Sequence, residues 1–308
     1  MKKILVIGSL NMDVTLKVPH IPIEGETILA KDKSHNRGGK GANQAVAIRR
    51  LGANTSMIGA VGNDDFGKEL LKGLKDEGID TEGIIIKESD TGTAYINLDD
   101  DGKNNIVVYT GANFELTPED IRSKEKIIKE SDYCVFQLEI PQETVKEAVR
   151  ICKKHGVKVI MNPAPAIKDL DDYIINNSDY MMPNESELEI LSGQKLSEDN
   201  LLDICKLQIE RGMENLIVTL GDKGSLYYNS EGYEFIDIIP TEVIDTTGAG
   251  DSFIGAFTNM ISEGKTDLEA LDYARYVASL TVSRAGAQKS LPNRDEADEF
   301  YRNNKMNV

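Results

Sequence analysis

The loop from Asp245 to Asp251 contains the residue types that phosphoryl transfer requires. Its sequence is DTTGAGD, and the apolar segment SFIGAF that follows is typical of the start of a helix. Glycine lets a ligand approach the backbone closely. The first turn of a helix leaves N–H groups unpaired, and such groups bind phosphate. We therefore expect the Gly248–Asp251 loop to form an anion hole, with the N–H groups of Ala249, Gly250 and Asp251 as donors.

Asp251 stands where this loop enters the expected helix, so we interpret it as the general base that takes the proton of the acceptor hydroxyl. The alternative is a glycine-rich turn in which the helix dipole merely favours a carboxylate. The length and order of the string favour the functional interpretation. No GxxxxGK[ST] string occurs in the chain, and Gly38–Gly41 lacks that spacing. Phosphate must therefore be held elsewhere, which agrees with an anion hole at Gly248–Asp251.

Other polar residues follow expected strands at their carboxyl ends, where open α/β sheets bind ligands. Asn11 and Asp13 come just after the first strand, and Glu139 follows the strand at 133–138. A carboxylate and an amide together suit paired sugar hydroxyls, and the segment Gly39–Asn43 adds backbone that a ligand can approach. Each of these residues taken alone is more often a turn or cap residue.

Two further motifs have plain structural alternatives. Asn184 is a good helix cap after Pro183, and Glu187 completes an approximate capping box, so the residues alone favour capping. A single carboxylate would also suit Mg²⁺, which keeps several of its waters. Thr219–Gly224 could be only a tight turn between two strands.

The motifs together resemble those of the ribokinase-like family of carbohydrate kinases, nearly from end to end. They are Gly8–Asp13, Gly38–Gln44, Gln137–Glu139, Asn162–Pro165, Pro183–Glu187, Thr219–Gly224, Asp245–Asp251 and Gly286–Gln288. The resemblance implies an enzyme that phosphorylates D-ribose at its 5-hydroxyl with ATP, giving D-ribose 5-phosphate and ADP, and a lid that ribose binding orders.

The resemblance also assigns residues to sites. Ribose would contact Asn11, Asp13, Gly39, Lys40, Gly41, Asn43, Glu139 and Asp251. The nucleotide would contact Asn184, Thr219, Gly221, Asp222, Lys223, Gly224, Gly250 and Arg275. Mg²⁺ would be organised by Glu187 through water, and K⁺ by Asp245, Thr247, Thr281, Arg284, Gly286 and Ser290, largely through backbone carbonyls.

Three alternatives stay open at this stage. Arg275 replaces the Asn or His that is frequent at that family position, which leaves the packing of the base undetermined. The sugar could be 2-deoxyribose, a nucleoside or another sugar, and the fold could also serve a non-catalytic sugar sensor. A sensor has no need of a base, so Asp251 argues against one. Asp245 could simply cap its own turn, with Ser290 an ordinary loop hydroxyl.

The elements that position these residues alternate between short apolar runs and amphipathic segments, which predicts a parallel sheet flanked by helices. We expect one domain over 1–308: an α/β three-layer sandwich with a mostly parallel central sheet and a small β-sheet lid. The expected lid strands are 12–18, 27–35, 93–98 and 105–109, with a hairpin turn at Asp99–Gly102. The expected central strands are 3–8, 56–61, 133–138, 157–162, 180–183 and 216–220. Helices are expected after Thr117, at 141–155 and after Asn293.

Composition limits the possible partners. The chain has 308 residues and a net charge of −17, which disfavours nucleic acid or an anionic membrane as a partner. The N-terminal apolar run Ile4–Ile7 is too short for a signal sequence. Three cysteines without metal-type spacing indicate reduced core residues of a cytoplasmic protein. The unpaired edges of the lid predict a homodimer.

Overall fold

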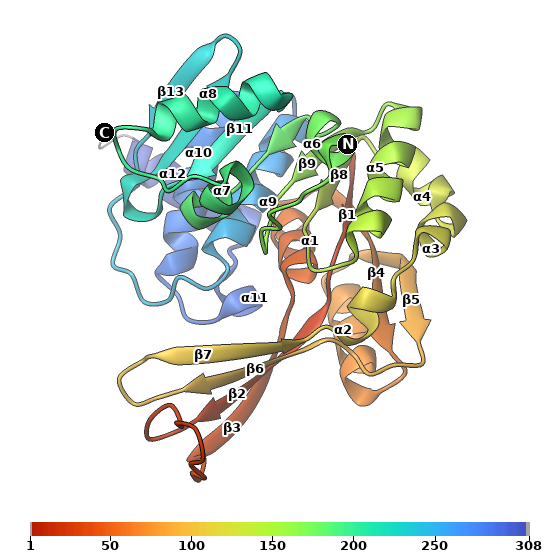
Figure 1. Ribbon diagram of the computed structural model, residues 1–308, viewed down its shortest axis with the longest axis vertical. Helices are drawn as coiled ribbons and strands as arrows, with labels where there is room; N and C mark the ends of the chain where they lie inside the picture. Colours follow the sequence, from red (N-terminus) through yellow and green to blue (C-terminus); the bar gives the residue numbers. More distant parts are fainter. Residues whose placement is uncertain (1, 306–308) are drawn as a thin grey trace.

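The computed structural model describes residues 2–305, in which a nine-stranded sheet lies between helices and a four-stranded sheet extends from it (Figure 1). In spatial order the large sheet consists of β13 (Gly232–Ile236), β12 (Ser225–Asn229), β11 (Asn215–Thr219), β10 (Tyr180–Met181), β9 (Lys158–Met161), β8 (Tyr133–Phe136), β1 (Lys3–Ile7), β4 (Asn54–Gly62) and β5 (Asp80–Lys87). The strands from β11 to β5 run parallel, whereas β12 and β13 are antiparallel to their neighbours.

The interior strand β1 shows why the sheet is covered on both faces. Ile4 and Val6 point into one apolar core, and Leu5 and Ile7 point into the other, so the run alternates between two buried faces. A continuous apolar run of this kind is typical of a parallel sheet that helices cover on both sides.

The helices divide between these two cores. The first core contains buried residues of α1 (Lys40–Arg50), α2 (Asp65–Asp76), α9 (Ala249–Ser262), α10 (Asp267–Val282) and α12 (Arg294–Lys305). The second contains those of α3 (Pro118–Ser123), α4 (Glu125–Lys129), α5 (Gln142–His155), α6 (Asp172–Asn176), α7 (Glu185–Ser192) and α8 (Leu201–Arg211). The short helices are α11 (Ala287–Ser290), η1 (Gly111–Glu115) and η2 (Gly221–Lys223).

The lid is the four-stranded sheet β3 (Asp32–Gly38), β2 (Asn11–Lys17), β6 (Thr93–Leu98) and β7 (Asn104–Tyr109), in that order, and it projects away from the large sheet (Figure 1). β2 pairs in parallel with β6 and antiparallel with β3. β6 and β7 form the predicted hairpin, with a hydrogen bond from Gly102 N–H to Asp99 O. β2 follows β1 almost directly, so the lid begins at the end of an interior strand of the large sheet.

The predicted fold class is confirmed, as are the predicted central strands apart from small shifts at their ends. The expected strand at 27–35 is wrong in its first half, because β3 begins at Asp32. The register explains this, since the last residue of β2, Lys17, pairs with Asp32. Leu29, beyond that pairing, is 86% exposed. The helix after Thr117 begins with a complete capping box to Asp120.

Two observations bear on the predictions from composition. All three cysteines are buried and free. No helix formed by residues 2–305 combines the length and the apolar character that crossing a membrane requires.

Candidate active site

The glycine loop meets the N-terminus of α9 as the sequence predicts. Gly248 caps the helix with φ 80°, in the left-handed region that glycine adopts without strain. The Ala249 N–H donates to Thr246 O at 3.2 Å, so this predicted donor of the anion hole is already used within the turn. The N–H groups of Gly250 and Asp251 have no backbone acceptor within residues 2–305. Two of the three predicted donors are therefore open to a ligand.

Two amide side chains at the start of α1 hold the Asp251 carboxylate. Asn43 Nδ2 donates to Oδ2 and Gln44 Nε2 donates to Oδ1, both at 3.0 Å. Burial raises the pKa of Asp251 above its usual range, while Lys40 and the two amides act in the opposite direction. A carboxylate with a raised pKa at a helix N-terminus is well suited to act as a base.

The glycines around Lys40 bring α1 against the beginning of the lid. Gly39 has φ 89°, and a Cβ there would lie 2.6 Å from the Asn11 nitrogen. A Cβ on Gly41 would lie 2.6 Å from the Ser9 nitrogen. Both glycines therefore permit a close backbone approach, and this approach places Lys40 and Asn43 beside Asp251.

Glu139 links the end of β8 to the same helix N-terminus. Its Oε2 accepts a hydrogen bond from the Lys40 N–H at 3.1 Å and another from the Ser9 hydroxyl. The predicted cluster of Glu139, Lys40 and Asp251 is therefore assembled from three separate elements.

Asn11 and Asp13 lie on β2 at the base of the lid. Asn11 is 4% exposed, and its Oδ1 accepts a hydrogen bond of 2.8 Å from Asn113. Asn113 also bonds the backbone N–H and carbonyl of Leu10, which fixes its own orientation. The Asn11 Oδ1 is therefore occupied, and its Nδ2 is the group that remains for a ligand.

The carboxylate of Asp13, like that of Asp251, has a raised pKa. Burial, then the charges of Glu139 and Asp251, raise its pKa from 3.8 to about 7. No hydrogen bond from another described residue offsets these effects. Three carboxylates thus lie close enough to influence one another, with Lys40 as the cation beside them. Hydroxyl groups of a ligand would supply the donors that Asp13 lacks.

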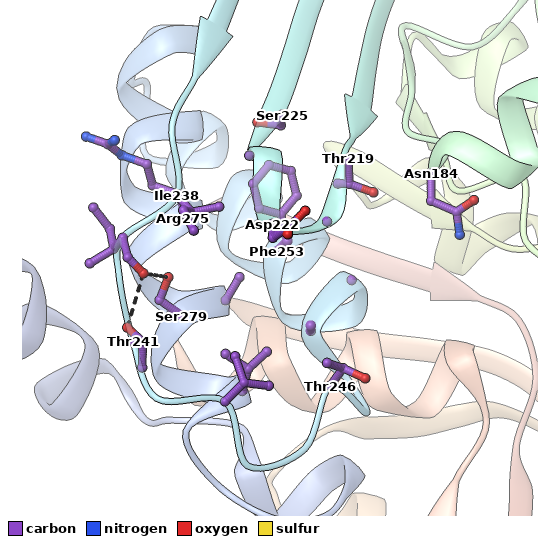
Figure 2. A pocket seen from close by; sticks show the side chains of 18 of the residues that line it. Asn184, Thr219, Asp222, Ser225, Ile238, Thr241, Thr246, Phe253, Arg275 and Ser279 are labelled. Atoms are coloured by element: carbon purple, nitrogen blue, oxygen red, sulfur yellow. Dashed lines mark hydrogen bonds between the residues drawn. The ribbon is translucent and has the colours of Figure 1, made fainter. Parts of the chain in front are cut away.

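A cavity of about 490 Å³ lies beside the N-terminus of α9, a volume within the range of small-molecule sites (Figure 2). Its walls are mostly apolar, including Ile238, Val243 and Phe253. Polar side chains lie on opposite sides of it: Figure 2 shows Asn184 and Thr219 on the right and Thr241, Ser279 and Arg275 on the left, with Asp222 between them. The predicted nucleotide residues on its lining are Asn184, Thr219, Gly221, Asp222, Gly224, Gly250 and Arg275.

The two cationic side chains predicted at the nucleotide site, Lys223 and Arg275, both form ion pairs with carboxylates of the protein. Lys223 lines neither this cavity nor the smaller one described below, and its ammonium pairs with Glu198 at 2.6 Å. The Arg275 guanidinium bonds Asp272 on its own helix and the Asp237 carbonyl. Arg275 thus borders the cavity with its charge already paired.

A smaller cavity of about 220 Å³ lies between the larger cavity and Asp251. Both cavities are lined by Thr219, Thr246 and Gly250. The smaller one also contains Lys40 and Asp251. A phosphate chain extending from the larger cavity would therefore pass along the open N–H groups of α9 towards Asp251.

Glu187 makes the capping box with Asn184 and also lines the smaller cavity. Its Oε2 accepts from the Asn184 N–H at 2.8 Å, and Asn184 Oδ1 accepts from the Glu187 N–H at 2.8 Å. The capping of α7 is therefore compatible with a contact between Glu187 and a ligand in the smaller cavity. Burial raises the pKa of Glu187, and the Asn184 hydrogen bond and Lys40 act in the opposite direction.

Residues 2–305 contain no group of three or more His, Cys, Asp or Glu side chains placed to hold a metal ion.

Asp245 closes its own turn and ties it to the C-terminal segment. Its Oδ1 accepts from the Thr247 N–H at 2.9 Å and its Oδ2 from the Gly286 N–H at 2.8 Å. Burial raises the pKa of Asp245, but these hydrogen bonds outweigh it and the pKa is lowered overall. The Thr281 and Ser290 hydroxyls donate to carbonyls of their own segments.

Arg284, another residue assigned to the potassium site, pairs with Glu296. Any cation held by this part of the molecule would therefore depend on backbone carbonyls.

Sequence reasoning assigned no role to several residues that orient the site. They are buried amides: Gln44, Asn113, Gln137, Asn162 and Gln288. Four of them stand inside the motifs Gly38–Gln44, Gln137–Glu139, Asn162–Pro165 and Gly286–Gln288, which was the available signal. Asn113 lies outside every motif, and only the fold places it beside Asn11.

Known proteins resemble this chain along nearly its whole length. The sequence profile described as the pfkB family carbohydrate kinase matches residues 1–294. A bifunctional ribokinase/ribose-5-phosphate isomerase A of Fructilactobacillus sanfranciscensis is 41% identical over 96% of this chain, and this chain spans 55% of that longer protein. A ribokinase of Haemophilus influenzae is 38% identical, with 97% of this chain and 98% of that protein aligned.

Two further proteins are similar over nearly the whole chain. A deoxyribokinase of Salmonella typhi is 35% identical, with 96% of this chain and 98% of that protein aligned. The solved structure of Arabidopsis thaliana ribokinase complexed with ribose and ATP has a TM-score of 0.91 and 32% identity, covering 98% of this chain and 99% of that one.

Proposed function

Because the chain belongs to the pfkB family of carbohydrate kinases and is a ribokinase-like sugar kinase, we propose that it phosphorylates D-ribose at the 5-hydroxyl with ATP. The products are D-ribose 5-phosphate and ADP. The observation that carries the proposal is the position of Asp251. It lies on the first turn of α9, at the junction between a nucleotide-sized cavity and a cluster of polar residues at the base of the lid.

In this proposal the polar cluster binds the sugar. Asn11 offers an amide donor, and Asp13 and Glu139 offer carboxylate acceptors. Lys40, Asn43 and the backbone of Gly39 and Gly41 complete the contact surface. A sugar hydroxyl suits such a mixture because it both donates and accepts.

The chemical step follows from the residues around Asp251. Asp251 takes the proton of the 5-hydroxyl as the oxygen attacks the γ-phosphorus, and the bond from that phosphorus to the bridging oxygen of ADP breaks. The open N–H groups of Gly250 and Asp251 stabilise charge on the transferring phosphoryl group. Lys40 lines the same cavity and adds positive charge there. The lid excludes water from the site.

We also propose that Mg²⁺ accompanies ATP. Glu187 fits this group, since the carboxylate lines the smaller cavity and makes one hydrogen bond, to the Asn184 N–H. Mg²⁺ keeps most of its waters, so one carboxylate acting through water is sufficient. When bound, the ion neutralises phosphate charge. For K⁺, the proposed site is the turn that Asp245 links to Gly286, with backbone carbonyls of the Thr247 and Thr281–Ser290 segments as ligands.

A homodimer through the lid is a further part of the proposal. Every residue of β7 is exposed, and Val107 is 65% exposed. β7 is also the edge strand of its sheet. Unpaired edges and apolar faces are normally covered, and a second lid would cover this one.

A coupled ADP-release assay over a panel of sugars tests the proposal. D-Ribose should be the preferred acceptor, and Asp251→Asn should lower its turnover by about 10²–10⁴-fold while leaving binding of ribose and ATP largely intact. Near-normal turnover in this variant would refute the role of Asp251. The deoxyribokinase relative supports one second candidate, 2-deoxyribose. Preference for that sugar in the same assay would replace ribose as the substrate.

A further inference from the structure

Behind Asp251 lie five buried amide side chains in two hydrogen-bonded branches that meet at its carboxylate: Gln137, Gln44 and Asn162 in one, Gln288 and Asn43 in the other. The backbone fixes the direction of the first branch at one end, because Asn162 Nδ2 donates to the Met182 carbonyl at 3.0 Å. The Asn162 Oδ1 therefore accepts, and it receives a hydrogen bond of 3.1 Å from Gln44 Nε2. The same Gln44 nitrogen donates to Asp251 Oδ1.

The other contacts of Gln44 and Asn43 follow the same direction. Gln44 Oε1 accepts from Gln137 Nε2 at 2.5 Å. Asn43 Oδ1 accepts from Gln288 Nε2 at 3.2 Å, and Asn43 Nδ2 donates to Asp251 Oδ2. Each oxygen of Asp251 thus receives one N–H donor whose amide is held in place by another amide.

This arrangement distinguishes the two protonation states of Asp251. An ionised carboxylate accepts both hydrogen bonds strongly, whereas protonation of either oxygen makes that oxygen a weaker acceptor for the amide N–H facing it. The charged groups near Asp251 do not by themselves favour its ionised form. Lys40 on α1 favours the ionised form, but Asp13 on β2, Glu139 after β8 and Glu187 on α7 oppose it, as does burial.

We propose that Gln44, and through Asn43 also Gln288, are positioning residues that keep the Asp251 carboxylate ionised and fixed towards the acceptor hydroxyl. The inference rests on the proposed role of Asp251 as the base. Neither glutamine has to touch the sugar or the nucleotide, and neither lines the two cavities. Their effect should therefore appear in turnover and its pH dependence rather than in substrate affinity.

The experiment compares Gln44→Met and Gln288→Met with the intact protein in the ADP-release assay across pH. Met keeps the length of the side chain and removes the amide. Loss of one hydrogen bond to a charged group should lower kcat of Gln44→Met about ten- to a hundredfold, and move the acid limb of its pH profile up by about one to two units. KM for ribose and for ATP should stay within about threefold. Gln288→Met should shift both quantities in the same direction by less.

Gln208→Met is the matched control, because Gln208 is a buried glutamine on α8, outside the lining of both cavities. It should keep the kcat and the pH profile of the intact protein. A Gln44→Met kcat within about twofold of the intact protein, or an unmoved acid limb, would overturn the inference. If Gln44→Met does not fold, an unchanged acid limb in Gln288→Met overturns it instead. Asp251→Asn, run alongside, separates this failure from failure of the base assignment.

Discussion

The raised pKa of Asp13 makes folding stability depend on pH in a direction opposite to that of most carboxylates. Its pKa is about 7 in the folded protein and 3.8 when unperturbed. The stability contributed by its proton is complete below pH 3.8 and is lost as the pH rises through 7. A difference of about 3 units corresponds to about 4 kcal/mol at 1.36 kcal/mol per unit. Ionisation of Asp13 costs this free energy in the folded protein because the carboxylate is buried beside Glu139 and Asp251.

Asp13→Asn removes the charge and keeps the shape. We expect the variant to be more stable than the intact protein, with a gain that grows by about 2–3 kcal/mol between pH 5 and pH 8. Urea unfolding at the two pH values, without sugar, measures this gain. The same variant should bind ribose more weakly, because the Asn side chain has one acceptor oxygen and one NH₂ donor where the carboxylate has two acceptor oxygens.

Asp120→Asn provides the control. Burial raises the pKa of Asp120, but hydrogen bonds from Lys87 and Thr117 outweigh it and lower the pKa overall. Both the folded and the unfolded pKa of Asp120 then lie below 5, so the effect of this substitution should be the same at pH 5 and pH 8. A gain for Asp13→Asn that is independent of pH would refute the proposed environment of Asp13.

Three other predictions follow from the site. D-Ribose should exceed 2-deoxyribose in kcat/KM, because a missing hydroxyl leaves buried polar groups unpaired at a cost of about 1–3 kcal/mol; equal or reversed efficiencies would contradict the ribose assignment. Turnover should rise when K⁺ replaces Na⁺ at constant ionic strength with saturating Mg²⁺ and ATP, and Asp245→Ala should abolish the rise; identical rates in both salts would remove the cation site. Sedimentation should give about twice 34.0 kDa, and Val107→Asp should give the monomer; a monomer before substitution would count against the lid interface.

Much of the fold follows from the sequence because the apolar runs are short, continuous and separated by amphipathic segments. β1 and its parallel neighbours are therefore predictable. The bounds of β3 are not, since its sequence DKSHNRG has no apolar alternation and its extent is set by its pairing with β2. Tertiary pairing decides such a segment, and local pattern cannot reveal it.

The site shows the same division. The proposed base and its loop could be identified because glycine, hydroxyl and carboxylate occur together in one short string. Asn113 could not be identified, since its role exists only when η1 lies against Leu10 and Asn11. The two cationic side chains predicted at the nucleotide site are paired for different reasons: the fold brings Glu198 to Lys223, whereas Asp272 lies three residues before Arg275 on the same helix.

The burial of the three cysteines gives this protein an internal reporter of its own opening. Cys134, Cys152 and Cys205 all belong to the apolar core on the side of the sheet covered by α3–α8. A thiol reagent can reach them only when that layer separates from the sheet, so the rate of labelling measures how often this happens. The chain contains no tryptophan, which makes thiol chemistry more informative here than intrinsic fluorescence. A ligand that binds the folded state suppresses such openings in proportion to its occupancy. The rate of thiol labelling therefore reports ligand binding at a distant site, and this measurement does not require catalysis.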